Sequence, residues 1–169
     1  SMELFICVSG LVSGPIPMVP RYVLGSWFSR YWPYADHEYK AIIEEYRAHG
    51  VGIDVLVMDM DWHLDGWTGY TWNPRYFPDP PAFLRWCREH RLRTTLNLHP
   101  ADGVGKHESC FRSMAAAMGV PRHVYRIPFD CASKEFMRAY FDVLHHPLEA
   151  QGVDFWWMDW QQGTETNIP

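Results

Sequence analysis

Apolar residues along the chain form two kinds of pattern, short continuous runs and longer stretches with helical spacing. Residues 55–58 read Val-Leu-Val-Met, and residues 155–158 read Phe-Trp-Trp-Met. Continuous apolar runs of this length are typical of parallel strands covered on both faces. We therefore predict strands over the following ranges: 23–29, 54–62, 94–99 and 154–160.

Stretches with helical periodicity separate these strands. In the first of them Asp36 stands at the expected N-cap and Gly50 at the expected stop, which predicts a helix over residues 37–49. The apolar positions on its predicted inner face are Tyr39, Ile42, Ile43 and Tyr46. Further helices are expected over residues 80–90, 107–118 and 133–150, and an extended piece over residues 124–129.

The order of these elements indicates the fold class. Strands that alternate with helices predict an α/β protein with a parallel sheet and right-handed crossovers. A (β/α)8 TIM barrel needs roughly 250 residues and eight strands, and its active site lies at the carboxyl ends of the strands. This chain has 169 residues and four predicted strands. We therefore expect an irregular lead-in over residues 1–20 and, over residues 21–169, the N-terminal half of such a barrel, with about the first four βα units.

Composition narrows the class of protein. Aromatic residues make up 16% of the chain, including nine tryptophans, which fits either a sugar-binding cleft or a Trp-rich core. The net charge is −5 and the basic residues are scattered, so no nucleic-acid partner is expected. No run approaches the roughly 20 apolar residues of a membrane span, and no clear signal peptide is present. A membrane partner is therefore not expected, and the compartment stays open.

Asp159 is the leading candidate for chemistry. It lies in the run Phe-Trp-Trp-Met-Asp-Trp, and a carboxylate among tryptophans is costly to bury unless something compensates. At the tip of a strand it suits a nucleophile that forms a covalent glycosyl intermediate. The alternative is an aspartate that caps the turn after the strand.

Asp59 and Asp61 form the second candidate pair. Two residues apart on a regular strand, they would face the same side, and sugar hydroxyls or a metal ion could relieve their repulsion. Alternatively one binds substrate and the other pairs with a nearby cation. His99, at the end of its strand, contacts substrate or serves as a structural histidine. A cation site is a further alternative, with the ligands Asp59, Asp61, His63, His99 and Asp159. A structural zinc site is not expected, because the four cysteines include no CxxC pair.

Five stretches together resemble glycoside hydrolase family 31, whose members are retaining α-glycosidases on a (β/α)8 barrel. The first reads PRYVLGSWFSR and the last, FWWMDW, is similar to the family's WxD nucleophile signature. The five cover residues 20–30, 46–62, 71–80, 96–100 and 155–160. This chain departs from the family pattern at Gln162, where many family members have an acidic residue.

The resemblance implies a role for each candidate. Asp159 matches the nucleophile, and Asp59 matches the carboxylate that grips sugar hydroxyls in the −1 subsite. Trp157 matches an aromatic wall of that subsite. The weaker expectations for residues that line it are Met60, Asp61, Trp27 and His99. No cofactor and no metal are implied, and the family's general acid/base belongs to the second half of the barrel.

These observations predict a retaining α-glycosidase that acts on an α-glycoside or oligosaccharide. The chain alone lacks the second carboxyl, so we expect it to be inactive by itself. Its open sheet edges are expected to pair with the missing C-terminal half or to self-associate. The alternatives are a non-catalytic half-barrel that binds sugar or a partner, and a metal-dependent barrel hydrolase.

Overall fold

A four-stranded parallel sheet forms the centre of the computed structural model. The model describes residues 17–64, 66, 68–121 and 123–159, with 10, 11 and 14. The strand order is β1-β2-β3-β6, and every neighbouring pair is parallel. The strands are β1 (Trp27–Phe28), β2 (Val55–Met58), β3 (Arg93–Leu98) and β6 (Phe155–Met158). The predicted parallel α/β organisation is therefore confirmed, as an open partial barrel.

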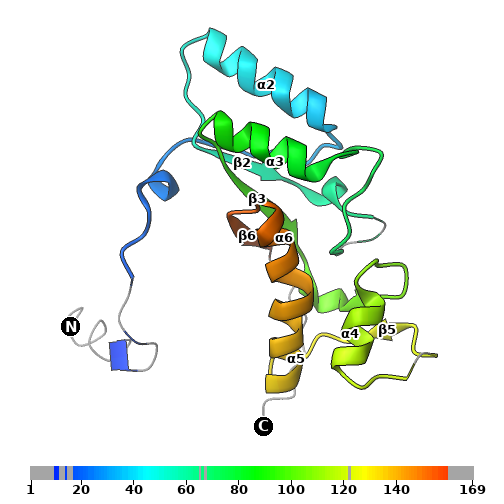
Figure 1. The fold of residues 1–169 in the computed structure, drawn as a ribbon. Coiled ribbons are helices and arrows are strands. Elements are labelled where there is room, and N and C mark those ends of the chain that lie inside the picture. The colour runs from blue at the N-terminus through cyan, green and yellow to red at the C-terminus, as the bar shows by residue number, and fades with distance from the viewer. Residues whose placement is uncertain are drawn as a thin grey trace.

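Helices connect the strands and cover one face of the sheet (Figure 1). Helices α2 (Asp36–Ala48) and α3 (Pro80–Glu89) lie side by side, and Tyr39 of α2 contacts Phe83 of α3. A continuous helical run leads into β6 and consists of α5 (Lys134–Ala139), the π-helix η4 (Tyr140–His145) and α6 (His146–Gln151). The π-helical turn lies just before Pro147, whose missing N–H and bulky ring disturb regular α-helical bonding.

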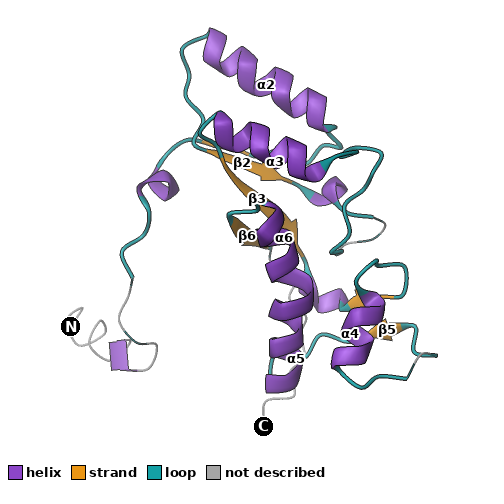
Figure 2. Ribbon diagram, viewed as in Figure 1, coloured by secondary structure: helices purple, strands orange, loops and turns teal. Residues whose placement is uncertain are grey.

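A small excursion follows β3 and lies apart from the main sheet (Figure 2). It contains η3 (Pro100–Asp102), β4 (Val104–Gly105), α4 (Phe111–Ala117) and β5 (Arg126–Ile127). The helix predicted over residues 107–118 is therefore shorter than expected. The extended piece predicted over residues 124–129 pairs antiparallel with β4, outside the parallel sheet.

Two predicted strands end earlier or begin later than expected. Strand β2 stops at Met58 because the chain turns there into the 3-10 helix η2 (Met60–Trp62). The strand predicted over residues 23–29 is only Trp27–Phe28, preceded by the 3-10 helix η1 (Arg21–Leu24). Trp160 and Gln162 lie outside the described residues, as does most of the predicted lead-in.

One expected helix cap is also wrong. Asp36 is the first residue of α2, and the N-cap is Ala35. The backbone N–H of Ala35 donates to Glu38 Oε2 at 2.7 Å. This is one of the two hydrogen bonds of a capping box, and the other cannot form because alanine has no polar side chain. The predicted stop of this helix holds, because Gly50 follows the end of α2 with a positive φ of 73°. At α3 the N-cap is Asp79, whose Oδ1 accepts a hydrogen bond from the Ala82 N–H.

The sheet has two different faces. Leu56, Met58, Leu96 and Leu98 are fully buried and belong to the core formed with the helices. The opposite face carries the alternate residues of each strand. On that face Trp27 of β1 contacts the rings of Phe155 and Trp157 of β6, with centroids 5.4 and 5.9 Å away. A flat sheet would hold these outer strands about 14 Å apart, so the contacts show a curled sheet with a concave aromatic face.

Two aspartates fix neighbouring strands at their amino ends. Asp54 Oδ2 accepts a hydrogen bond from the Ser26 N–H, which ties β1 to β2. Asp154 Oδ2 accepts one from the Thr94 N–H, and Asp154 Oδ1 pairs with Arg93 at 2.8 Å, which ties β6 to β3. These bonds set the register that brings the carboxyl ends of β2, β3 and β6 together.

Burial of His145 makes stability depend on pH. Its ring packs 4.2 Å from that of Trp156, and burial lowers its pKa to about 4. Because the unfolded chain takes up the proton near pH 6.5 and the folded one only near pH 4, stability falls as pH drops through this window. We expect a loss of about 2 kcal/mol between pH 7 and pH 5 from this residue.

Urea unfolding at pH 7 and pH 5 checks this prediction. His145→Phe should remove that part of the pH dependence, while His146→Phe, at an exposed neighbouring histidine, should leave it in place. An equal pH dependence in wild type and His145→Phe would contradict it.

Among the described residues, no helix is both long enough and apolar enough to cross a lipid bilayer.

Candidate active site

Polar side chains gather where β2, β3 and β6 end. Asp59 follows β2, Asn97 lies near the end of β3 with His99 just beyond it, and Asp159 follows β6. The parallel register sets Asn97 opposite Trp157, so the residues that follow these strands come to one edge of the sheet. The sequence prediction that polar residues meet at the carboxyl ends of the strands therefore agrees with the structure.

Asp59 is held at the point where β2 turns into η2. Its Oδ1 accepts hydrogen bonds from the Met60 N–H at 2.7 Å and from Asn97 Nδ2 at 2.8 Å. The side chain is partly exposed. One backbone donor and one side-chain donor therefore fix the orientation of the Asp59 carboxylate. Both bonds go to Oδ1, and Oδ2 accepts no hydrogen bond from the described residues.

Asp159 is anchored through both its backbone and its side chain. Its N–H donates to the Leu98 carbonyl at 3.0 Å, which continues the β3–β6 ladder by one residue. Its Oδ2 lies 3.4 Å from His99 Nε2 and 3.4 Å from Asn97 Nδ2. The His99 side chain is 3% exposed and that of Asp159 is 29% exposed, so a buried imidazole lies against a carboxylate that is partly open to solvent.

Aromatic side chains lie beside these carboxylates on the concave face. Trp157 precedes Asp159 by two residues and contacts Trp27 across the face. The Trp27 indole donates to the Val23 carbonyl at 3.2 Å, which fixes its plane. Trp157 is 36% exposed, so it offers a ring surface next to Asp159. The structure thus brings Asp59, His99 and Asp159 together around Asn97, and it places Trp157 on the same face of the sheet, in contact with Trp27.

Met60 and Asp61 are placed differently from the expectation. Because β2 ends at Met58, Asp59 and Asp61 do not follow regular strand alternation, and the same-face argument for the pair is wrong. Met60 and Asp61 line a neighbouring cavity with Tyr31 and Arg75. Burial raises the pKa of Asp61, and the negative charge of Asp59 adds to the rise.

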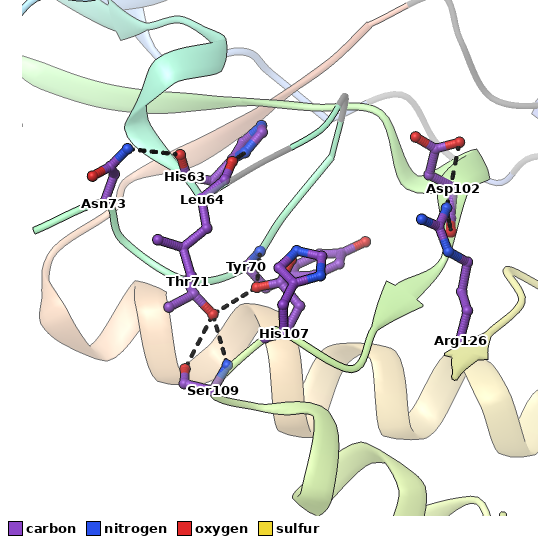
Figure 3. A network of polar contacts seen from close by, with 10 residues as sticks. His63, Leu64, Tyr70, Thr71, Asn73, Asp102, His107, Ser109 and Arg126 are labelled. Atoms are coloured by element: carbon purple, nitrogen blue, oxygen red, sulfur yellow. Dashed lines mark hydrogen bonds and ion pairs between the residues drawn. The ribbon is translucent and has the colours of Figure 1, made fainter. Parts of the chain in front are cut away.

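A buried carboxylate fastens the loops beyond β2 and β3 to each other (Figure 3). Glu108 Oε2 accepts hydrogen bonds from the Tyr70 N–H at 3.2 Å and the Thr71 hydroxyl at 2.6 Å. Thr71 Oγ1 in turn accepts from the Ser109 N–H at 2.9 Å, and His107 Nε2 lies 3.3 Å from Glu108 Oε1. These contacts join the segment that follows Asp59 to the segment that follows His99, and so stiffen one rim of the site.

The described residues form no cluster of ligands for the predicted cation site. Within residues 17–64, 66, 68–121 and 123–159, no group of three or more His, Cys, Asp or Glu side chains is arranged to hold a metal ion. His63 is buried, its Nδ1 lies 2.7 Å from the Leu64 carbonyl, and burial lowers its pKa. His63 therefore belongs to the packing around Trp62 and not to the carboxylate pair.

Asn97 is the site residue that the sequence analysis missed. It is a buried amide, 4% exposed, one residue before the end of a strand whose other buried residues are threonines and leucines. It precedes His99 by two residues, which sets both on the concave side. A polar residue at an inward position of a buried strand was the available signal.

Comparison with known proteins gives one family and a set of similar folds. The model of the glycosyl hydrolases family 31 TIM-barrel domain matches residues 16–168. An alpha-xylosidase from Saccharolobus solfataricus is 21% identical over 154 residues, which are 88% of this chain and 20% of that protein. The chain therefore spans about a fifth of that curated relative.

Two solved structures share the fold. A family 31 alpha-glucosidase from Bacteroides thetaiotaomicron has a TM-score of 0.67 at 25% identity, over 94% of this chain and 29% of the other. A cycloalternan-degrading enzyme from Trueperella pyogenes, solved in complex with a covalent intermediate, has a TM-score of 0.64 at 14% identity, over 92% and 26%.

Proposed function

Because this chain belongs to glycosyl hydrolase family 31, we propose that it forms the N-terminal half of the catalytic barrel of a retaining α-glycosidase. The observation that carries the proposal is the pair of carboxylates at the carboxyl ends of β2 and β6, joined through Asn97 and flanked by aromatic rings. The proposed substrate class is an α-glycoside or oligosaccharide.

Asp159 is the proposed nucleophile. In a retaining enzyme a carboxylate attacks the anomeric carbon, the leaving oxygen takes a proton from a second carboxyl group, and water later releases the sugar with retained configuration. His99 and Asn97 hold Oδ2 of Asp159 and thereby fix the rotation of its carboxylate. A rotationally fixed nucleophile loses little entropy on reaching the transition state.

Asp59 and the tryptophans are the proposed sugar-binding groups. With Oδ1 of Asp59 engaged by Met60 and Asn97, Oδ2 is the oxygen directed to sugar hydroxyls. Trp157 offers an aromatic wall for the apolar face of the sugar, and Trp27 supports that wall from across the sheet. Met60 and Asp61 line the adjacent cavity and are proposed to line the substrate site there.

The general acid/base and the rest of the barrel are proposed to come from outside these four strands. Strands β1 and β6 each pair with one neighbour within the described residues, so each has a second edge that can accept a partner strand. We propose that the C-terminal half of the barrel occupies these edges, with self-association of the chain as the alternative. On this account the chain alone does not turn over substrate.

An assay with aryl α-glycosides tests the proposal. The complete barrel protein that contains this chain should release the aryl group, and ¹H NMR of the first sugar formed should show the α-anomer. The 169-residue chain alone should show no turnover. Formation of the β-anomer would contradict the retaining mechanism, and sugar binding without any turnover in the complete protein would favour the non-catalytic binding module.

A further inference from the structure

Three observations indicate that Asn97 has a role in the candidate site beyond packing in the sheet. It is 4% exposed, it lies between the two carboxylates, and its amide nitrogen is within hydrogen-bonding distance of both. The distances from Nδ2 are 2.8 Å to Asp59 Oδ1 and 3.4 Å to Asp159 Oδ2. An amide NH2 group carries two hydrogens, so one nitrogen can serve both acceptors.

The chemistry of the neighbours fixes which way the amide points. If the amide were reversed, its oxygen would face two carboxylates and both bonds would become repulsive contacts. In the observed orientation Oδ1 is buried and meets no hydrogen-bond donor among the described residues. A buried acceptor without a donor costs about 1–3 kcal/mol, so the bonds to the carboxylates must outweigh that cost.

The backbone of Asn97 is also held. Its carbonyl accepts a hydrogen bond from the Trp62 indole N–H at 2.8 Å, and Trp62 is 1% exposed. Strand pairing sets Asn97 opposite Trp157 of β6, and its neighbour Leu96 is paired with Met58 of β2. The amide therefore sits on a rigid support, which is what a group that sets the positions of two other groups requires.

We propose that Asn97 is a positioning residue that couples the sugar-gripping carboxylate Asp59 to the nucleophile Asp159. It donates one N–H to each, which holds the two carboxylates at a fixed separation and fixes the orientation of Oδ2 of Asp159. This inference rests on the proposed function, because Asn97 acts on the reaction only through these two aspartates.

The effect on ionisation has a definite sign. A donor to a carboxylate stabilises the charged form, so its removal raises the pKa of that carboxyl group. The other groups that face the pair are Asp61 on η2, His99 beyond β3 and Tyr39 on α2. The negative charges of Asp59 and Asp61 add to the effect of burial in raising the pKa of Tyr39, which indicates that its hydroxyl lies close to them.

Asn97→Leu in the complete barrel protein tests the proposal, because leucine keeps the branched shape and removes the amide. With ¹³C-labelled aspartate, NMR titration should show that the carboxyl group of Asp159 or Asp59 takes up its proton at a higher pH than in the wild type. The acidic limb of the pH profile of kcat/KM should move upward by the same amount. Thr95→Val, on the same face of β3 and equally buried, should change neither measurement.

Each outcome decides the question. If Asn97→Leu folds and the titration of both carboxyl groups is unchanged, the proposal is overturned. It is also overturned if the carboxyl titration moves but the acidic limb of the kcat/KM profile does not, because Asn97 would then not act on the reaction. If Asn97→Leu does not fold, Asn97→Ala removes the same amide with a smaller side chain, and unchanged carboxyl titration there also overturns the proposal. Failure of the proposed function shows separately, as absence of turnover in the wild-type protein.

Discussion

Replacement of Asp159 by alanine should lower kcat/KM of the complete barrel protein by at least roughly 10⁴-fold, because the covalent route disappears with its nucleophile. Asp159 is held by the Leu98 carbonyl, His99 and Asn97, and none of these can replace a carboxylate at the anomeric carbon. The side chain is 29% exposed, so its removal should leave the fold intact.

Azide separates loss of the nucleophile from a general loss of structure. In the space vacated in Asp159→Ala, azide should attack an activated aryl α-glycoside and yield a glycosyl azide of inverted configuration, with part of the rate restored. Asp142→Ala serves as the matched control, because that carboxylate is 61% exposed on η4 and far from the strand ends in sequence. Near wild-type activity in Asp159→Ala would remove Asp159 from the mechanism.

The second large effect is expected at Asp59. Asp59→Asn should lower kcat/KM by roughly 10²- to 10³-fold, because hydrogen bonds between a carboxylate and sugar hydroxyls strengthen in the transition state. The change also disturbs Oδ1, which serves the Met60 N–H and Asn97. We therefore expect kcat to fall together with a rise in KM.

Deoxy substrates identify which part of this loss comes from sugar contacts. The wild-type protein should be less active on a substrate that lacks the hydroxyl bound by Asp59 than on the full substrate. With Asp59→Asn, removal of the same hydroxyl should reduce activity little further. Asp61→Asn, two residues further along the chain in η2, should cost much less with the same substrates. Fully additive losses between the deoxy substrates and Asp59→Asn would contradict a direct contact between Asp59 and the sugar.

Sequence patterns predicted the elements well where one signal dominated. Strands β2, β3 and β6 and the end of α2 before Gly50 all lie within a few residues of their predicted places. The excursion between β3 and α5 was harder, because β4 and β5 have two residues each and pair only with one another. Such short strands depend on tertiary contacts and leave little periodicity to detect.

Candidate residues could be predicted where the side chain alone signals chemistry. Asp59, His99 and Asp159 come together as their positions after three parallel strands imply. Asp61 was misplaced because the sequence does not show that the strand breaks at Met58 and continues as a 3-10 turn. Asn97 was missed because its importance comes from the two carboxylates on neighbouring strands, which are 38 and 62 residues away.

The most direct test of the account is to trap the covalent intermediate. The complete barrel protein should be treated with a fluorinated glycosyl fluoride that forms the glycosyl–enzyme quickly and hydrolyses slowly, then digested and analysed by mass spectrometry. The account predicts one added sugar on the peptide that contains Asp159, and none in Asp159→Ala. A sugar attached to another residue, or steady turnover of the reagent with no attached sugar, would contradict it.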